Sequence, residues 1–196
     1  MNATTQPGGP GHRFPPVISH DTPIGKLTLA ASAQGLTRAR LHRAAPLPKP
    51  EAESIDPSVR RWLDQARREL DEYFAGRRHE FSVPVDLSRV ELHHRRVLDY
   101  LADVGYGRTS TYGALATALG LTEDGPRRVG AAMARNPVLI VVPCHRILGA
   151  GGKLTGYAGG PGAKRWLLDL EGREHTPQLD LHLEPATRPG VAAMMR

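Results

Sequence analysis

The sequence predicts an α+β fold: a small N-terminal α/β domain with an antiparallel sheet, then a mostly helical C-terminal domain. Three observations predict it. Short alternating apolar segments separated by turn residues fill the first half, apolar residues at helical spacing dominate the second, and one continuous apolar run there indicates a short buried strand. With 196 residues and 40% hydrophobic content, the chain can bury one large core or two small ones.

The expected boundaries follow changes in composition. Residues 1–16 are rich in Pro and Gly and predict a disordered tail, because so few apolar side chains cannot offset the entropy of ordering. Residues 17–90 are expected to form the N-terminal scaffold domain and residues 91–172 the C-terminal domain. Residues 173–196 are expected to be a flexible tail.

The N-terminal sheet is predicted from three strand-like segments. They are residues 17–20, residues 26–32 with alternating Leu27 and Leu29, and residues 35–42. The turn sequence DTPIG separates the first two. We therefore expect an antiparallel meander.

A helix is predicted over residues 58–76, after a Pro-rich segment at 44–53 that indicates a loop. Gly76 provides a helix stop. Residues 79–87 contain a proline within an apolar run, which favours a short strand at a sheet edge. The helix carries an apolar stripe that should pack on the sheet: Val59, Trp62, Leu63, Ala66, Leu70, Tyr73 and Phe74.

The C-terminal domain begins with a predicted helix over residues 95–104, which should bury Val97, Leu98 and Leu101. The following turn offers Thr109 and Ser110 as candidate caps for a second helix, which ends at Gly120.

A third helix is predicted over residues 126–136, opening with Pro126 and closing before Pro137. With the preceding helix it forms a helix-turn-helix pattern. Val129, Ala132 and Met133 should face the core. Arginines beside small residues would let the opposite face approach a phosphate backbone closely, although a solvated basic face is an equally good interpretation. That face comprises Arg127, Arg128, Ala131, Ala134 and Arg135.

Charge and cysteine content limit the function classes. The net charge of +6 and pI near 9.9 favour a polyanionic partner, and residues 125–168 hold seven Lys or Arg and no Asp or Glu. A single cysteine excludes an internal disulfide and a thiolate zinc cluster, so we expect a cytoplasmic protein without metal or cofactor. No segment approaches the about 20 apolar residues that span a bilayer, and no targeting segment is evident. We expect no membrane partner.

The single cysteine follows an apolar run at residues 138–142, which predicts a buried strand that delivers Cys144 to an edge or pocket. An inert core thiol is the ordinary alternative. His145 is adjacent, but adjacent side chains diverge in extended backbone, so proton transfer through a water is the simpler arrangement. A histidine base also needs an acceptor on its other nitrogen, and Glu171 and Asp169 are the candidates.

The stretch PCHRILG, with RRVGAAMARNPVLIVV before it and GKLTGYAGGPGAKRWLLDLEG after it, resembles the active-site region of the O6-alkylguanine-DNA alkyltransferases. The resemblance is strong over residues 90–172 and looser over residues 19–87. It implies a DNA repair protein that flips O6-alkylguanine out of double-stranded DNA and transfers the alkyl group irreversibly to its own cysteine. A monomer acting once is therefore expected.

The resemblance also implies roles for single residues. Cys144 matches the alkyl acceptor, His145 the residue that deprotonates it through a water, and Glu171 the carboxylate that orients the histidine. Asn136 matches an asparagine that braces the site, and Tyr112 a tyrosine that donates to guanine N3.

Arg127 matches the arginine that fills the gap left by the extruded nucleotide. Arg146 is expected to be structural, tying the active-site loop to the domain. The main-chain carbonyls of Cys144 and Ile147 match acceptors for the guanine amino group, and the amide of Ala158 a donor to O6. The expected substrate-pocket residues are Ile147, Tyr157, Ala158, Gly159 and Lys164.

Some positions depart from the family pattern. Leu92, His93 and Leu98 stand where relatives usually carry an aromatic residue, a glutamine and another aromatic residue, and Arg128 stands where a small residue is common. The alternatives are an alkyltransferase-like protein that binds lesions without transfer, a helix-turn-helix regulator, and a cysteine hydrolase. Lesion-binding relatives of the first kind replace the cysteine, which this chain retains.

Overall fold

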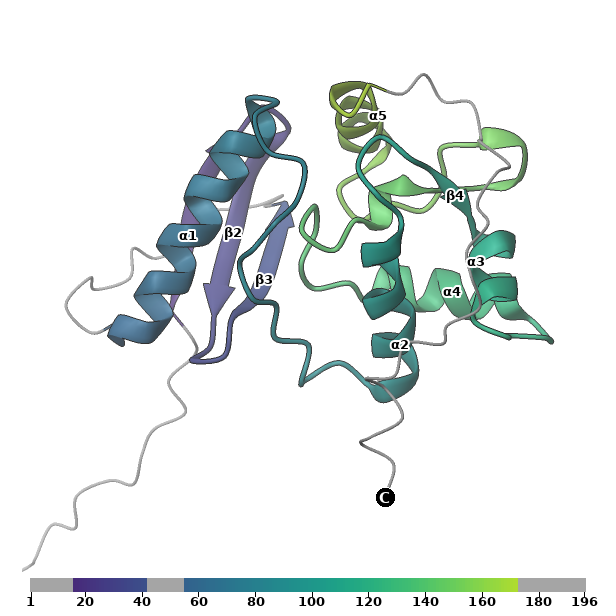
Figure 1. Ribbon diagram of the computed structural model, residues 1–196, viewed down its shortest axis with the longest axis horizontal. Helices are drawn as coiled ribbons and strands as arrows, with labels where there is room; N and C mark the ends of the chain where they lie inside the picture. Colours follow the sequence, from purple (N-terminus) through teal and green to yellow (C-terminus); the bar gives the residue numbers. More distant parts are fainter. Residues whose placement is uncertain (1–15, 42–54, 173–196) are drawn as a thin grey trace, which may run out of the picture.

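The computed structural model describes residues 16–41 and 55–172. Figure 1 shows two parts side by side, with the sheet and α1 on one side and the other helices on the opposite side. The expected tail at residues 1–16 falls, except for Pro16, outside the described residues. The expected loop at residues 44–53 and the tail at residues 173–196 fall outside them entirely.

The N-terminal part is a three-stranded antiparallel meander in the order β1-β2-β3, as the sequence predicts. The strands are β1 (Val17–Thr22), β2 (Gly25–Ala31) and β3 (Leu36–Leu41). Thr22 pairs with Gly25, so the turn between the first two strands is shorter than the sequence indicates.

Helix α1 (Pro57–Phe74) packs on this sheet and confirms the predicted amphipathic helix. Asp56 caps it by accepting a 2.8 Å hydrogen bond from the Ser58 amide, and Pro57 occupies the first turn. Gly76 follows the end in a left-handed conformation, with φ of 69°. The buried stripe includes most of the predicted residues: Val59, Leu63, Ala66, Leu70 and Tyr73.

The prediction of a strand at residues 79–87 is wrong. The segment forms one isolated parallel bridge, between Leu36 and Val85. Pro84 has no amide hydrogen, and the carboxylate of Glu69 on α1 accepts the amide hydrogens of Ser82 and Val83 at 2.9 and 3.1 Å. These donors are therefore not available to a neighbouring strand.

The C-terminal part is mostly helical, which confirms the predicted fold class. Its α-helices are α2 (Leu92–Tyr100), α3 (Tyr112–Ala118), α4 (Gly125–Ala134) and α5 (Pro161–Leu170). Two short strands, β4 (Ser110–Thr111) and β5 (Ile147–Leu148), pair in parallel. Short 3₁₀ turns occupy Leu101–Asp103, Cys144–Arg146 and Ala150–Gly152.

Helices α3 and α4 pack on each other as the predicted helix-turn-helix pair. The cap of α3 is Thr111, whose hydroxyl accepts from the Ala114 amide at 3.1 Å, and not Thr109 or Ser110. Those two side chains are buried, and Ser110 belongs to β4. The first helical residue is thus Tyr112, which places its side chain beside the C-terminal loops.

Helix α2 starts three residues earlier than predicted and continues as a 3₁₀ turn. Val97, Leu98 and Leu101 are buried as expected. Leu92, by contrast, is 66% exposed, so its departure from the family pattern does not affect core packing.

The buried strand expected at residues 138–142 is a tight turn. Val142 donates its amide hydrogen to Val138 at 3.0 Å, and Ile140 has φ of 75°, a left-handed value that is unusual for a β-branched residue. Leu139 and Pro137 form backbone hydrogen bonds with Ala39 of β3, which anchors the turn to the sheet. No helix in the described ranges combines the length and apolar character that crossing a membrane requires.

Candidate active site around Cys144

The thiol of Cys144 lies just after this turn, at the start of the 3₁₀ segment, and the residue is 3% exposed. The side-chain amide of Asn136 donates to Sγ at 3.0 Å and to the Val142 carbonyl at 2.9 Å. Its oxygen accepts from the Val138 amide at 2.9 Å. Asn136 therefore holds both ends of the turn and the sulfur together.

Burial raises the pKa of the Cys144 thiol to about 11, and the Asn136 hydrogen bond and the nearby Lys164 ammonium only partly oppose this. The thiol is therefore protonated at neutral pH. A nucleophilic sulfur at this position requires a base that removes its proton during the reaction.

His145 is fully buried, and its Nε2 lies 3.0 Å from Oε1 of Glu171. The carboxylate can only accept, so Nε2 carries the imidazole proton and Nδ1 is left as a basic nitrogen. Among the described residues, Nδ1 has no hydrogen-bond partner. Burial lowers the pKa of His145 despite the neighbouring carboxylate, which keeps the ring neutral and able to accept a proton.

Glu171, at the C-terminal end of α5, accepts hydrogen bonds from distant parts of the chain. Tyr73 of α1 donates to Oε1 at 2.8 Å, Arg146 donates to both oxygens at 2.9 and 3.0 Å, and the Gly107 amide donates to Oε2 at 3.2 Å. Burial alone would raise the pKa of this carboxyl, but the His145 and Arg146 contacts outweigh it and hold the pKa at about 2. The site therefore contains a permanent carboxylate.

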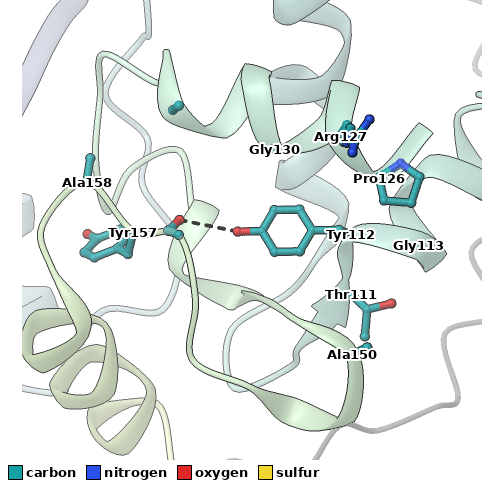
Figure 2. Close-up of a pocket in the computed structure, with 11 residues that line it drawn as sticks. Thr111, Tyr112, Gly113, Pro126, Arg127, Gly130, Ala150, Tyr157 and Ala158 are labelled. Atoms are coloured by element: carbon teal, nitrogen blue, oxygen red, sulfur yellow. Dashed lines mark hydrogen bonds between the residues drawn. The ribbon is translucent and has the colours of Figure 1, made fainter. Parts of the chain in front are cut away.

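A cavity of about 810 Å³ opens beside this assembly, between α3, α4 and the loop at residues 150–158. Figure 2 shows the ring of Tyr112 pointing across it. Oη of Tyr112 lies 3.4 Å from the carbonyl oxygens of both Thr155 and Gly156. The lining includes Tyr112, Gly130, Arg127, Tyr157 and Ala158.

Cys144 does not line this cavity but lies close to its wall. Burial raises the pKa values of Tyr112 and Tyr157, and the Cys144 sulfur is close enough to raise both further. Two of the rings that line the cavity therefore lie near the sulfur.

Both parts of the chain match family models of known proteins. Residues 18–87 match the family model described as 6-O-methylguanine DNA methyltransferase, ribonuclease-like domain. Residues 93–173 match the model described as 6-O-methylguanine DNA methyltransferase, DNA binding domain.

The chain belongs to the 6-O-methylguanine DNA methyltransferase family.

Named relatives of this methyltransferase family cover most of the chain. A methylated-DNA–protein-cysteine methyltransferase of Mycolicibacterium paratuberculosis is 41% identical over 163 residues, covering 80% of this chain and 92% of the relative. A DNA base-flipping protein of Thermus thermophilus is 39% identical over 152 residues, covering 77% and 96%. The crystal structure of Mycobacterium tuberculosis OGT in complex with DNA matches with a TM-score of 0.67 and 40% identity, covering 82% and 94%.

The structure brings most residues expected for this methyltransferase family into one region. Cys144, Asn136, His145 and Glu171 form one cluster, and of the two candidate acids it is Glu171 that contacts the histidine, whereas Asp169 is exposed. Arg146 ties the active-site segment to the Val104 carbonyl, as a structural residue would, and also contacts Glu171 directly.

The expected pocket residues separate into two groups. Tyr157 and Ala158 line the cavity, whereas Ile147, Gly159 and Lys164 do not. Lys164 is fully buried and donates from Nζ to the carbonyls of Ile147 and Thr155 at 2.5 and 2.8 Å. It therefore joins β5 to the loop that forms one wall.

The expected DNA-facing residues lie along one side of α4. Arg127 is 86% exposed and lines the cavity. Arg128 and Ala131 line a separate depression of about 210 Å³, and exposed Arg135 donates to the Ala131 carbonyl at 3.1 Å.

Sequence reasoning missed the contact of Tyr73 with Glu171. The apolar spacing places Tyr73 in the buried stripe of α1, where its ring does lie. A buried tyrosine hydroxyl usually requires a hydrogen-bond partner, and that requirement was the available signal.

Proposed function

We propose that this chain repairs double-stranded DNA by transferring the alkyl group from O6 of alkylated guanine to Sγ of Cys144, once per molecule. The observation that carries the proposal is the assembly of a buried thiol, an adjacent neutral histidine and a permanent carboxylate beside an open cavity, with the basic nitrogen of the histidine unpaired among the residues described. Membership of the methyltransferase family and a DNA-bound relative support it.

The chemistry balances with the residues present. The thiol proton passes through a water to Nδ1 of His145, and Sγ attacks the alkyl carbon as the carbon–O6 bond breaks. The electron pair of that bond goes to guanine, which takes up a proton and returns to its normal form. Glu171 stabilises the imidazolium that forms in between. The thioether formed on Cys144 has no route back to a free thiol, so each protein molecule is consumed by one transfer.

The base must leave the duplex to reach the sulfur, at a cost of a few kcal/mol. We propose that Arg127 fills the vacated position in the stack, since its exposed side chain lines the rim of the cavity. Tyr112 would exchange its 3.4 Å contacts with the loop carbonyls for a hydrogen bond to guanine N3. The Ala158 amide would stabilise charge developing on O6.

The transfer as proposed uses no metal and no cofactor, because the thiol, the alkylated base and a water supply all the atoms that move. Action as a monomer and a cytoplasmic location remain predictions.

The test is to incubate the protein with a duplex that carries one O6-methylguanine and to map the modified peptide by mass. We expect the peptide containing Cys144 to gain one CH₂, with one methyl transferred per protein molecule. The Cys144→Ala variant should bind the duplex and leave the lesion intact. Repair by that variant, or repeated turnover, would contradict the proposal.

A second candidate is lesion recognition without transfer, because one relative at 39% identity is named a DNA base-flipping protein. The same experiment separates the two. Tight binding of the lesion duplex with no mass change on the Cys144 peptide would favour recognition alone.

A further inference from the structure

A cluster of metal-binding side chains lies at the start of α2, in the segment that departs from the family pattern. Glu91 precedes the first helical residue, and His93 and His94 follow in its first turn. Oε2 of Glu91 lies 3.4 Å from Nε2 of His93 and 3.5 Å from Nδ1 of His94. The three ligand atoms all lie within 4.8 Å of one another.

His94 provides a second observation that points to a ligand. The residue is 6% exposed, and its Nδ1 is buried without a hydrogen-bond partner among the described residues, although it faces Glu91. A buried polar atom left unpaired costs about 1–3 kcal/mol. A bound ion at this point would satisfy it.

The carboxylate of Glu91 is likewise not used as a helix cap. It occupies the position before the helix, where a side chain commonly accepts a hydrogen bond from the first turn, yet it makes no such bond. Its carboxylate turns to the two imidazoles instead. Glu91 and His93 are 70% and 61% exposed, so an ion from solvent can reach them.

We propose that Glu91, His93 and His94 bind a divalent transition-metal ion of the Zn²⁺ type. Two nitrogens and one carboxylate oxygen suit zinc, and not the all-oxygen sites of Mg²⁺. Ligand atoms about 2.0–2.2 Å from a tetrahedral ion are about 3.3 Å apart, close to the two separations found here. A fourth position stays open to solvent.

The site lies beside the basic face of α4. His93 and His94 share the depression of about 210 Å³ with Arg128 and Ala131. The positive charge of a bound Zn²⁺ ion is larger than the negative charge of the Glu91 carboxylate. The occupied site would therefore add positive charge next to that face. The alkyl-transfer proposal requires nothing from this cluster, and the two proposals stand or fall separately.

The test is a titration of the full chain with ZnCl₂ alone, followed by calorimetry, with MgCl₂ as the comparison ion. His93→Gln and Glu91→Gln each remove one ligand, and glutamine is the residue that the family resemblance expects at position 93. His79→Gln is the matched control, because His79 is an exposed histidine outside the cluster. All variants retain Cys144 and the remaining histidines, so those contributions cancel.

We expect the wild type and His79→Gln to bind one zinc ion more than the two cluster variants, or to bind it at least about tenfold more tightly. Zinc should raise the melting temperature of the wild type and of His79→Gln, and not that of the two cluster variants. Equal zinc binding in all four proteins, or equal competition by Mg²⁺, would overturn the proposal. Methyl transfer in the presence of EDTA, measured in parallel, reports on the alkyl-transfer proposal alone.

Discussion

Glu171 is the residue on which the charges of the candidate site converge. It accepts hydrogen bonds from a tyrosine, an arginine, a histidine and a backbone amide, while Cys144 is left protonated at neutral pH by its own burial. The carboxylate therefore fixes the histidine tautomer that leaves Nδ1 free to act as a base. Its charge state should also affect stability.

The folded-state pKa of Glu171, about 2, is lower than the ordinary value of 4.5, so its contribution to stability is present above pH 4.5 and is lost as the pH falls toward 2. Glu171→Gln cannot titrate. We expect the difference in free energy of unfolding between wild type and this variant to narrow by about 3 kcal/mol between pH 6 and pH 2. Urea denaturation across that range measures it. A difference in free energy of unfolding that stays constant with pH would contradict the lowered pKa of Glu171.

Among the elements, the loop before α5 depends on a close approach that only glycine permits. A Cβ atom on Gly159 would lie 2.5 Å from the Tyr157 ring and 2.7 Å from the Leu41 side chain of β3. The loop therefore packs on the sheet and the cavity wall at the same point.

Gly159→Ala should destabilise the protein by about 1–3 kcal/mol, because either the Tyr157 ring or the Leu41 side chain must move. The control is Gly162→Ala in α5, where a Cβ atom would meet no atom of residues 16–41 or 55–172 within 4 Å. That change should be neutral or stabilising by up to about 1 kcal/mol. Urea denaturation of both variants checks the pair, and equal stability losses would argue against the steric explanation.

The sequence predicts best the elements whose apolar residues recur at a regular spacing and so form one buried face. Helix α1 is an example, since its apolar spacing, Asp56 cap and Gly76 stop all agree. Residues 138–142 are apolar on every side, and such a run does not distinguish a strand from a turn inside the core. In this segment the side chain of Asn136 favours a turn over a strand, because it forms hydrogen bonds with both ends of the turn.

The candidate site shows the same limit. The sequence identifies Cys144, His145 and Glu171 through a local motif, and the structure joins them. The sequence does not reveal that Thr111 caps α3, because three adjacent hydroxyl residues compete for the cap position. The contact from Tyr73 depends on packing between segments 98 residues apart in sequence.

Across the whole molecule, the hydrogen bond from Tyr73 to Glu171 links the N-terminal part to the reactive cluster. Tyr73 lies on α1, which packs on the sheet, and Glu171 closes α5 in the helical part. Figure 1 places these helices in opposite halves of the molecule. The N-terminal part therefore supplies a group that positions the carboxylate.

Tyr73→Phe keeps the ring and removes the donor. We expect methyl transfer to slow by about tenfold and the free energy of unfolding to fall by about 1.5–3 kcal/mol, as for a hydrogen bond to a charged group. Single-turnover transfer rates and denaturation measure the two effects. Tyr106→Phe is the control, because Tyr106 donates to the Leu170 carbonyl and not to Glu171. Equal slowing of methyl transfer in both variants would contradict a specific effect of the hydrogen bond from Tyr73 to Glu171.

The seclusion of the lone sulfur has a practical consequence for anyone who handles this protein. Because Cys144 is the only cysteine and is enclosed in the native state, a colour-forming thiol reagent should react sluggishly with folded samples and promptly after denaturation. Each chain that has accepted an alkyl group loses that signal for good. The colour developed in denaturant would then count the unspent molecules in a preparation, without a radioactive substrate.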